Sequence, residues 1–461
     1  MRPLSVSQIA GWCEGRHLGA DATVHSVSID TRTLTPGALF VALRGEQVDG
    51  HDLVGQAQAR GAAALLVQRD VECDLPRILC ADTEEALGEF AAGVQKGRPA
   101  VVVALTGSNG KTSVKMLTHG ILSRAGRSYI NPGNRNNEIG LPLAVIDAPE
   151  DAQFAIYEMG AGKPGDIAYL ASIAPPQVAL VNNVAAAHME RMGSLLGVAE
   201  TKGAIYEALS DDGVAVINAD DAFAPYFTRL VGSRRIFRFG LENDADVRGS
   251  RIRHQPGSSM FQLHTPAGAA QIKLPLPGVH SVMNALAASA LALAAGADFD
   301  SVVEGLHSAA PVQGRQISQR MNNGAMLIDD SYNANPGSVA AAIATLAQGE
   351  GEAWLVLGDM AELGEGAAAL HSDAGLLAKR AGLTRLWTVG SLSRAASVAF
   401  GAGGVHHDSR EELVAALNHA LQGSGDRRTL RVLVKGSRSS AMDKVVSALL
   451  ALDNQETGHA A

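Results

Sequence analysis

Cysteine is scarce in this chain, which holds three cysteines in 461 residues. All of them, Cys13, Cys73 and Cys80, lie in the first fifth of the sequence. They are too few and too clustered for a disulfide framework, and their spacing is not that of a zinc site. We therefore expect buried thiols in a reducing compartment.

Long apolar runs and an excess of basic charge are also missing, and we do not expect a secretory leader. No stretch reaches the roughly 18 apolar residues of a membrane-spanning helix, and the N-terminus MRPLSVSQIAGWCEG has no apolar core or cleavage site of a secretory signal. A formal net charge of -9 argues against nucleic acid or an anionic membrane as the main partner. The sequence thus predicts a cytoplasmic protein without membrane insertion. We expect a monomer that acts on small molecules.

Apolar, strand-like runs alternate with helical ones along almost the whole chain. With 46% hydrophobic residues, the chain can form packed cores, and its length indicates about three domains. Strands with helical crossovers favour parallel sheets covered on both faces. Two polar, Pro-bearing seams, QKGRPAV (95–101) and SAAPVQGRQ (308–316), predict domains at 1–97, 98–312 and 313–461. Residues 237–278 differ, because they resemble short, turn-rich strands of a side sheet or insertion.

The stretch VVVALTGSNGKTSVKML (101–117) predicts a strand, a glycine turn and a helix. The strict phosphate-loop pattern fails, since Leu105 stands where the first glycine is required. The remaining residues still suit an anion: glycines let backbone N–H groups turn toward it, and the helix N-terminus is positive. The predicted ATP-binding residues here are Gly107, Ser108, Asn109, Gly110, Lys111, Thr112 and Ser113. The alternative is an ordinary turn with an incidental lysine.

Further motifs accompany this turn in a fixed order. They include NPGNRNNEIGLPL, YEMGAGKPGDI, NNVAAAHMERMGS, ETKGAIYEAL, LIDDSYNANPGS, LGDMAELG and VLVKGSRSSAMD. Together with TGSNGKTS, they resemble the Mur ligases, ATP-dependent enzymes that build the peptide of the bacterial cell-wall precursor. NNEIGLPL, DDSYNANP and LGDMAELG look like the branch of the family that adds D-alanyl-D-alanine.

The resemblance implies both a fold and a reaction. The fold would be α/β, with an N-terminal UDP-substrate domain, a central parallel-sheet domain like a P-loop ATPase, and a Rossmann-like C-terminal domain. The reaction would join D-alanyl-D-alanine to UDP-N-acetylmuramoyl-tripeptide through an acyl phosphate, with ATP giving ADP and phosphate. The product would be the pentapeptide precursor of peptidoglycan.

The resemblance also assigns catalytic and metal-binding roles. Lys111 would hold the phosphates, while Thr112 and Glu158 would bind the first of two Mg²⁺ ions. His188 would bind the second ion. Lys202 would be carbamylated to N6-carboxylysine, which is an anion able to ligate Mg²⁺ or its water. Without the family, Glu158 and His188 are a loop carboxylate and a lone histidine after strand-like runs, and Lys202 is an ordinary helix lysine.

The substrate sites are implied in the same way. Asn284 would contact adenine, and Arg315 with Asp330 would reach ATP from the third domain. The uridine nucleotide would meet Asp30, Thr31, Arg32, Asp49, Gly50 and His51. The tripeptide would lie near Asn134, Asn136 and Asn137, and the dipeptide near Asn333 and Asn335, with Lys435 and Arg438 suited to its carboxylate. Without the family, the loop residues could simply belong to polar turns. Asn284 could lie on the polar face of a helix, and Arg315 and Asp330 could form a charge pair without a ligand.

Two rival functions stay open at this point. The first is another member of the superfamily, either the ligase that adds the third residue or folylpolyglutamate synthase, which would share the equivalents of Glu158 and Lys202. No DNPR stretch, usual in the diaminopimelate-adding enzyme, occurs here. The second is a non-catalytic nucleotide-binding or scaffold protein. Candidates at every metal position argue against it.

Overall fold

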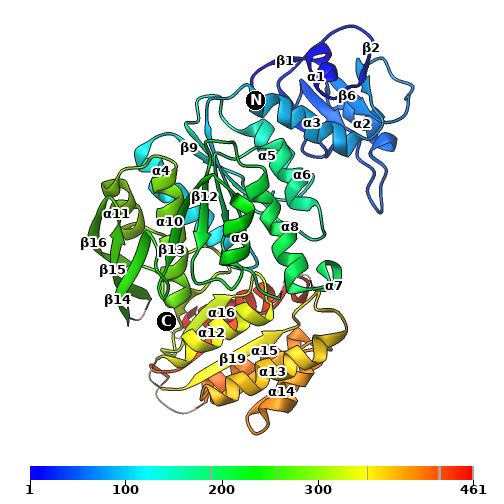
Figure 1. Ribbon diagram of the computed structural model, residues 1–461. Helices are drawn as coiled ribbons and strands as arrows, with labels where there is room; N and C mark the ends of the chain where they lie inside the picture. Colours follow the sequence, from blue (N-terminus) through cyan, green and yellow to red (C-terminus); the bar gives the residue numbers. More distant parts are fainter. Residues whose placement is uncertain (187–188, 256, 350, 424–426, 459–461) are drawn as a thin grey trace.

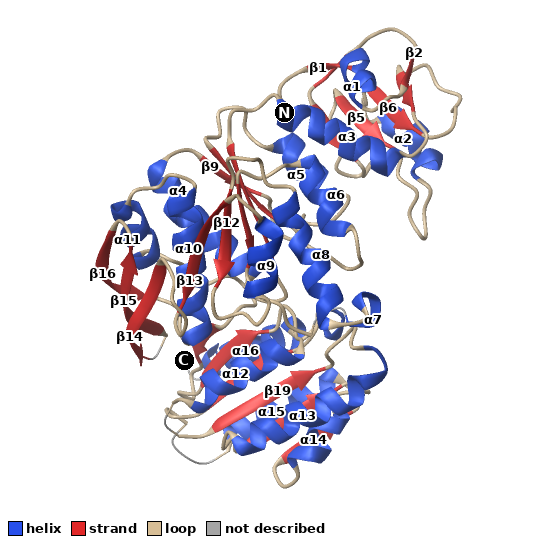
Figure 2. Cartoon of the chain, viewed as in Figure 1, coloured by secondary structure: helices blue, strands red, loops and turns tan. Residues whose placement is uncertain are grey.

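A computed structural model describes residues 1–186, 189–255, 257–349, 351–423 and 427–458. Three large sheets follow one another along the chain, one for each lobe of the molecule (Figure 1). Helices cover the sheets in each lobe (Figure 2). No helix of the described residues combines the length and apolar character needed to cross a bilayer.

The N-terminal lobe is built on a five-stranded sheet in the order β2-β7-β6-β5-β4. Strands β4 to β7 run parallel, so that their carboxyl ends share one edge. Its elements are β1 (Leu4–Ser5), α1 (Val6–Trp12), β2 (Arg16–Leu18), β3 (Thr23–Val24), β4 (Ser26–Ser28), β5 (Ala38–Val41), η1 (Gly50–Leu53), α2 (Val54–Ala59), β6 (Ala64–Val67), β7 (Arg77–Leu79) and α3 (Thr83–Lys96).

The central lobe holds a nine-stranded sheet in the order β16-β15-β14-β13-β12-β11-β8-β10-β9. Along β8, Val102 and Ala104 face one hydrophobic cluster while Val103 and Leu105 face the other, as expected for a strand buried on both faces. Its elements are β8 (Val101–Thr106), α4 (Lys111–Ala125), β9 (Ser128–Ile130), α5 (Gly140–Asp147), β10 (Phe154–Glu158), α6 (Asp166–Ile173), β11 (Val178–Val181), α7 (Met189–Met192), α8 (Leu195–Glu207), β12 (Val214–Asn218), α9 (Ala224–Val231), β13 (Arg235–Gly240), β14 (Val247–Gln255), β15 (Ser258–Thr265), β16 (Gly268–Leu274), α10 (Val279–Ala294) and α11 (Phe299–His307).

The turn-rich region 237–278 does not form a separate side sheet. After β13, strands β14, β15 and β16 extend the central sheet itself, with antiparallel pairing between β14, β15 and β16. Phe261, Leu263 and Ile272 point into the same cluster as α4 and α10. The sequence correctly predicted strands here. It did not show that their alternating apolar residues pack into the core of the central lobe.

The C-terminal lobe has a six-stranded sheet, β17-β18-β22-β19-β20-β21, parallel except for the β17-β18 pair. Its elements are β17 (Ile317–Arg320), β18 (Met326–Asp330), α12 (Pro336–Ala347), β19 (Ala353–Gly358), η2 (Gly364–Gly366), α13 (Ala367–Arg380), β20 (Arg385–Val389), α14 (Arg394–Phe400), β21 (Gly404–His407), α15 (Arg410–Gln422), β22 (Arg431–Lys435), η3 (Arg438–Ser440) and α16 (Asp443–Gly458).

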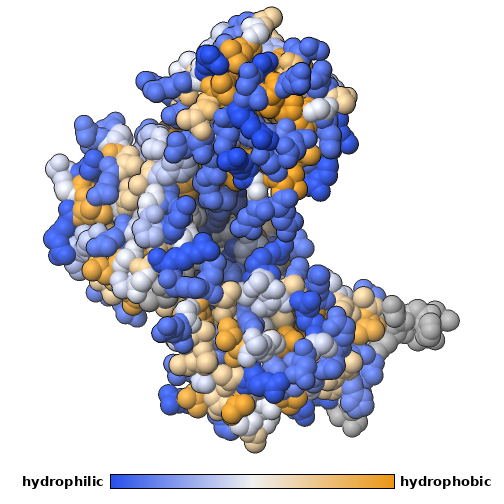
Figure 3. Space-filling model, turned by 90° about the vertical axis from the view of Figure 1, so that its right-hand side faces the viewer, coloured by the Kyte–Doolittle hydropathy of each residue, from blue (hydrophilic) through white to orange (hydrophobic). Residues whose placement is uncertain are grey.

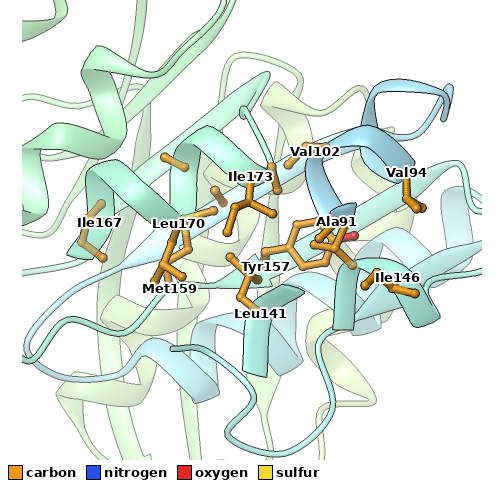
Figure 4. Packing of buried hydrophobic residues seen from close by; sticks show 14 of the residues in the cluster. Ala91, Val94, Val102, Leu141, Ile146, Tyr157, Met159, Ile167, Leu170 and Ile173 are labelled. Carbon is orange, nitrogen blue, oxygen red and sulfur yellow. The ribbon is translucent and has the colours of Figure 1, made fainter. Parts of the chain in front are cut away.

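The N-terminal and central lobes share one continuous hydrophobic core. Helix α3 begins at its cap Asp82, whose side chain accepts the N–H groups of Glu84 and Glu85. Its apolar face, including Ala91 and Val94, packs on residues of α5, β10 and α6 (Figure 4). Arg98 at the seam is buried and donates to the carbonyls of Ile146 (3.3 Å) and Ala148 (2.6 Å). These contacts fix the first two lobes to each other.

Candidate active site

The glycine turn lies at the carboxyl end of β8, between β11 and β10 in the sheet. The strand order reverses here, as at the ligand-binding edge of other open α/β sheets. Gly110 precedes α4 with φ of 78°, and a Cβ there would lie 2.4 Å from Oδ1 of Asn284. Only glycine fits, so the backbone can pass close to Asn284 and aim the first N–H groups of α4 outward. The turn therefore has the geometry of an anion-binding loop.

Two asparagines after β11 brace the turn. The N–H of Ser108 donates to the carbonyl of Asn183 (3.0 Å), and the N–H of Asn109 donates to its Oδ1 (2.8 Å). Asn182 donates to the carbonyl of Asn109 at 2.9 Å and to Oδ1 of Asn284 at 3.2 Å. The ammonium of Lys111 folds back and donates to the Gly107 carbonyl at 2.8 Å. The loop is thus preorganised, with a lysine above it.

Glu158, the last residue of β10, lies beside this turn and is buried. Its Oε2 accepts the Thr112 hydroxyl at 2.9 Å and lies 3.3 Å from the Lys115 ammonium. Its Oε1 accepts the amide of Asn136 at 2.9 Å. The predicted metal pair, Thr112 and Glu158, is therefore in contact.

The charges around Glu158 explain its ionisation. Burial alone would raise the pKa of the Glu158 carboxyl, but Lys115, Lys111 and Arg315, with the Thr112 hydroxyl, hold it below its ordinary value. The carboxylate is thus anionic at neutral pH. Among the described residues, no group of three or more His, Cys, Asp and Glu side chains gathers as a metal site. One carboxylate and one hydroxyl fit Mg²⁺ when phosphate oxygens supply further ligands, as in other nucleotide sites.

Lys202 lies on α8 and is buried. Burial, with a smaller effect from Lys111, lowers the pKa of its ammonium from 10.5 to about 7. A neutral amine is what carbamylation by CO₂ requires. The side chain thus suits the predicted modification. His188, the predicted second metal ligand, lies outside the described residues.

A cavity of about 940 Å³ lies between the central and C-terminal lobes. The glycine turn, Glu158 and Asn284 line it from the central lobe, and Arg315 and Asp330 line it from the C-terminal side. On one face of the molecule, a hollow bordered mainly by hydrophilic residues separates the N-terminal lobe from the C-terminal lobe (Figure 3). Most of the predicted ATP residues, all but Gly107 and Thr112, thus line a single space, which Asn134, Asn136 and Asn137 also line.

Polar contacts connect the C-terminal lobe to the glycine turn. Arg315 donates to the Thr112 hydroxyl at 3.0 Å, so this hydroxyl meets groups from both lobes. The amide of Asn335 donates to Oδ1 of Asn109 at 2.8 Å, while its own Oδ1 caps α12 through Ser338. The nitrogen and the oxygen of the Asn335 amide are therefore both hydrogen-bonded, so this residue connects helix α12 to the glycine turn. Its predicted contact with the dipeptide stays a prediction.

Other residues of the C-terminal lobe occupy the cavity wall. The guanidinium groups of Arg315 and Arg438 lie over the ring of Tyr332, at 4.4 Å and 5.8 Å from its centroid. Lys435 is buried and paired with Asp330 at 2.7 Å, and it also donates to the carbonyl of Asn333. In this arrangement the Lys435 ammonium is already paired with Asp330, and its predicted contact with a dipeptide carboxylate stays a prediction. Arg438 is exposed and lies 3.8 Å from Asp443, and its contact with the dipeptide carboxylate stays a prediction as well.

The predicted uridine-nucleotide residues gather at one edge of the N-terminal sheet. Asp30, Thr31 and Arg32 follow β4, and Asp49 to His51 follow β5, its parallel neighbour. Asp30 pairs with Arg32 at 2.7 Å. His51 is buried, with Nδ1 at 2.7 Å from Asp49 and Nε2 accepting the N–H of Gln68. Both imidazole nitrogens are engaged, so His51 shapes the loop, and its contact with the nucleotide stays a prediction.

Several side chains at the site were missed from the sequence. Lys115, Asn182, Asn183, Tyr332 and Glu362 were not predicted as site residues. Lys115 could have been noticed in the sequence, because it is a charged residue between the apolar Val114 and Leu117 of the same helix. It lies one helical turn after Thr112. The contacts of the other four depend on loops that only meet in the folded chain.

Comparison with known proteins gives the same picture. Models described as "Mur ligase family, catalytic domain", "Mur ligase middle domain" and "Mur ligase, glutamate ligase domain" match residues 23–95, 105–292 and 315–438. A relative from Escherichia coli (strain K12) is 44% identical over 450 residues, which are 97% of this chain and 99% of the relative. The chain belongs to the Mur ligase family. The E. coli relative is named UDP-N-acetylmuramoyl-tripeptide--D-alanyl-D-alanine ligase.

Solved structures resemble this Mur ligase over nearly its full length. A crystal structure of MurF from Acinetobacter baumannii has a TM-score of 0.93 at 32% identity, covering 98% of this chain and 99% of the other. MurF from Thermotoga maritima in complex with ADP has a TM-score of 0.84 at 27% identity, covering 94% and 99%. The predicted family and the predicted three-domain α/β fold are thus confirmed. The domain boundaries and the individual site residues stay predictions.

Proposed function

We propose that this Mur ligase joins D-alanyl-D-alanine to UDP-N-acetylmuramoyl-tripeptide and converts ATP to ADP and phosphate. One observation carries the proposal beyond similarity: the Thr112 hydroxyl contacts Glu158 of the central lobe and Arg315 of the C-terminal lobe, and both of these partners line one cavity. A nucleotide phosphate held by the glycine turn would therefore meet groups of both lobes.

The chemistry brings two anions together, since a tripeptide carboxylate must approach the γ-phosphate. Such a step needs positive charge and alignment more than covalent help. Lys111, Arg315 and the N-terminus of α4 supply that charge around the glycine turn. When bound, Mg²⁺ would polarise the phosphate oxygens. Thr112 and Glu158 would hold it there.

The acceptor would extend from the N-terminal lobe toward the cavity. Its uridine nucleotide would lie at the edge formed by the residues after β4 and β5, and its peptide would cross the hollow of Figure 3 toward Asn134, Asn136 and Asn137. Asn136 donates to Glu158, so the peptide carboxylate would arrive beside the phosphate. The Asn loop thus connects the acceptor with the nucleotide.

The dipeptide donor would enter from the C-terminal lobe. Glu362 and Arg438 both line the cavity, and their loops follow the neighbouring strands β19 and β22. The two loops are joined, because the Ser437 N–H and the Ser440 hydroxyl donate to the Asp359 carbonyl. A carboxylate and a guanidinium on one wall match the amine and carboxylate ends of a dipeptide. The amine would then attack the acyl phosphate, with loss of phosphate.

Other parts of the proposal concern the working enzyme. We expect two Mg²⁺ ions, with His188 at the second, and N6-carboxylysine at Lys202. We also expect a monomer in the cytoplasm. The low pKa of Lys202 supports the modification.

Release of ADP and phosphate tests the function directly. The purified chain is incubated with ATP, Mg²⁺ and UDP-N-acetylmuramoyl-tripeptide, with and without D-alanyl-D-alanine, using both the diaminopimelate and the lysine tripeptides. We expect sustained release only when both substrates are present. Release driven by an acidic or dibasic amino acid would instead identify a sister ligase, and no release with any acceptor would favour a nucleotide-binding scaffold.

A further inference from the structure

Lys115 is a buried cation that the proposed chemistry does not use. It lies on α4 three residues after Thr112, on the same helix face, and only 1% of its surface is exposed. Its ammonium lies 3.3 Å from Oε2 of Glu158 and donates to the carbonyls of Asn131 (3.0 Å) and Gly133 (3.1 Å). An ammonium has three N–H donors and no acceptor. Its three partners are all acceptors, so every donor is used.

The two carbonyls belong to the loop that carries the acceptor asparagines. Asn131 is itself buried, and its amide donates to the carbonyls of Glu158 (3.0 Å) and Arg135 (2.8 Å). The N–H of Glu158 donates back to Oδ1 of Asn131 at 3.0 Å. Asn136 of the same loop holds the other carboxylate oxygen of Glu158. The end of β10 and residues 131–136 therefore form one hydrogen-bonded unit.

Lys115 connects this unit to the nucleotide helix. Burying an unpaired charge is very costly, so a lysine is tolerated here only because its partners compensate it. A methionine would fill the space but would leave two carbonyls without this donor and the Glu158 carboxylate without its nearest cation. An arginine would present a planar fork that does not match three acceptors around a point charge. The site thus requires an ammonium for reasons of geometry.

We propose that Lys115 is a positioning residue, which fixes the Glu158 carboxylate and the loop 131–137 relative to the glycine turn so that acceptor and nucleotide are aligned. The part of this inference that concerns the acceptor rests on the proposed function. The part that concerns Glu158 rests only on binding of the nucleotide and its Mg²⁺, and not on the identity of the acceptor or the donor.

Nucleotide binding tests the second part without any peptide substrate. ADP affinity is measured by calorimetry with and without Mg²⁺ for the wild type, Lys115→Met and the control Lys273→Met, which removes an exposed lysine of β16. We expect Lys115→Met to bind ADP normally without Mg²⁺ but to lose about 10- to 100-fold of the gain that Mg²⁺ brings, as for other partners of a metal ligand. The control should match the wild type. An unchanged Mg²⁺ effect in Lys115→Met would overturn the inference.

Steady-state kinetics test the first part. For Lys115→Met, we expect a higher KM for the UDP-tripeptide and a lower kcat, with little change in the KM for D-alanyl-D-alanine, whose site lies on the other lobe. Lys115→Arg should not restore the wild-type values, since charge alone is insufficient. A variant that loses kcat with all three KM values unchanged would contradict the link to the acceptor loop.

The wild type provides a readout should both variants fail to fold. Addition of ADP and Mg²⁺ should slow hydrogen exchange at the amides of residues 131–137, because Lys115 and Glu158 connect them to the nucleotide. Exchange that is unaffected by the ligand would refute the connection. This result does not depend on which acceptor the enzyme uses, so it separates failure of this inference from failure of the proposed function.

Discussion

The pKa of Lys202 leads to a quantitative prediction about its modification. At pH 7, a lysine with the ordinary pKa of 10.5 is neutral in about one molecule in 3000, whereas Lys202, with a pKa of about 7, is neutral in about half. Burial thus raises the fraction of the amine that is neutral, and therefore reactive, roughly a thousandfold. Attack of the amine on CO₂ forms an N–C bond, releases a proton and leaves a carbamate anion. We expect Lys202 to be carbamylated near neutral pH, where exposed lysines are not.

Labelling with ¹³C-bicarbonate measures this directly. At constant dissolved CO₂, the carbamate signal in the ¹³C spectrum of the chain should be present near neutral pH, should fall steeply below about pH 7 as the amine becomes protonated, and should be missing from Lys202→Met. A signal that appears only above pH 9, as for an ordinary lysine, or an equal signal in Lys202→Met, would refute the reasoning. Activity is not needed for this readout, so a failed assay of ligation leaves the test intact.

The same pKa determines how stability depends on pH in CO₂-free buffer. The pKa of Lys202 is lower in the folded state than in the unfolded state, so burying its ammonium lowers the unfolding free energy. This destabilisation is fully present below about pH 7 and is relieved as pH rises toward 10.5. At pH 7 this cost is roughly 4 kcal/mol. Lys202→Met should therefore be the more stable protein, and its advantage in unfolding free energy should shrink by about 2 kcal/mol between pH 7 and 9. A difference that does not vary with pH would show that the amine is not desolvated.

Three further substitutions test other contacts. Gly110→Ala places a methyl group against Asn284 at a residue with positive φ. The binding free energy of ADP, measured by calorimetry, should therefore weaken by about 1–3 kcal/mol. The control Gly55→Ala, whose methyl group meets no atom within 4 Å, should bind ADP normally. Tyr332→Leu removes the ring that lies under two guanidinium groups and should raise the KM for D-alanyl-D-alanine. Tyr332→Phe retains the ring and should keep this KM near the wild-type value. An equal change of the KM in both variants would exclude the ring as the cause. Arg98→Met leaves buried carbonyls without a donor and should cost about 2–4 kcal/mol in denaturant unfolding, and a loss below about 0.5 kcal/mol would contradict its anchoring role.

Much of the fold could be predicted because buried parallel strands have a simple pattern. The apolar run at 101–106 is buried on both faces, and its place before a glycine turn located the nucleotide edge of the sheet. Glu158 was located by the same logic, since carboxyl ends of parallel strands share one edge. Where a strand alternates, as β15 does, the pattern indicates a half-buried strand but not which sheet it joins.

The contacts of the site were less predictable than its residues. Lys435 and Asp330 lie 105 residues apart in the sequence, and only the pairing of β18 with β22 shows that they neutralise each other. Asn335 resembles a plain N-cap in the sequence, and its bond to Asn109 depends on how two lobes meet. Single residues show which chemistry is available. Partners across lobes depend on tertiary geometry, which no local pattern contains.

The two predicted seams differ in a way that bears on catalysis. Both carry Pro and Gly breaks, which from the sequence alone would suit a hinge. At the first, Arg98 is anchored by carbonyls of the central lobe and α3 shares its core with α5 and α6, so bending there would expose apolar surface. At the second, the contacts are polar, such as Arg315 with Thr112, and they surround a cavity. Polar contacts can exchange with water or ligand at little cost. Closure that excludes water from an acyl phosphate should therefore be a movement of the C-terminal lobe against the other two.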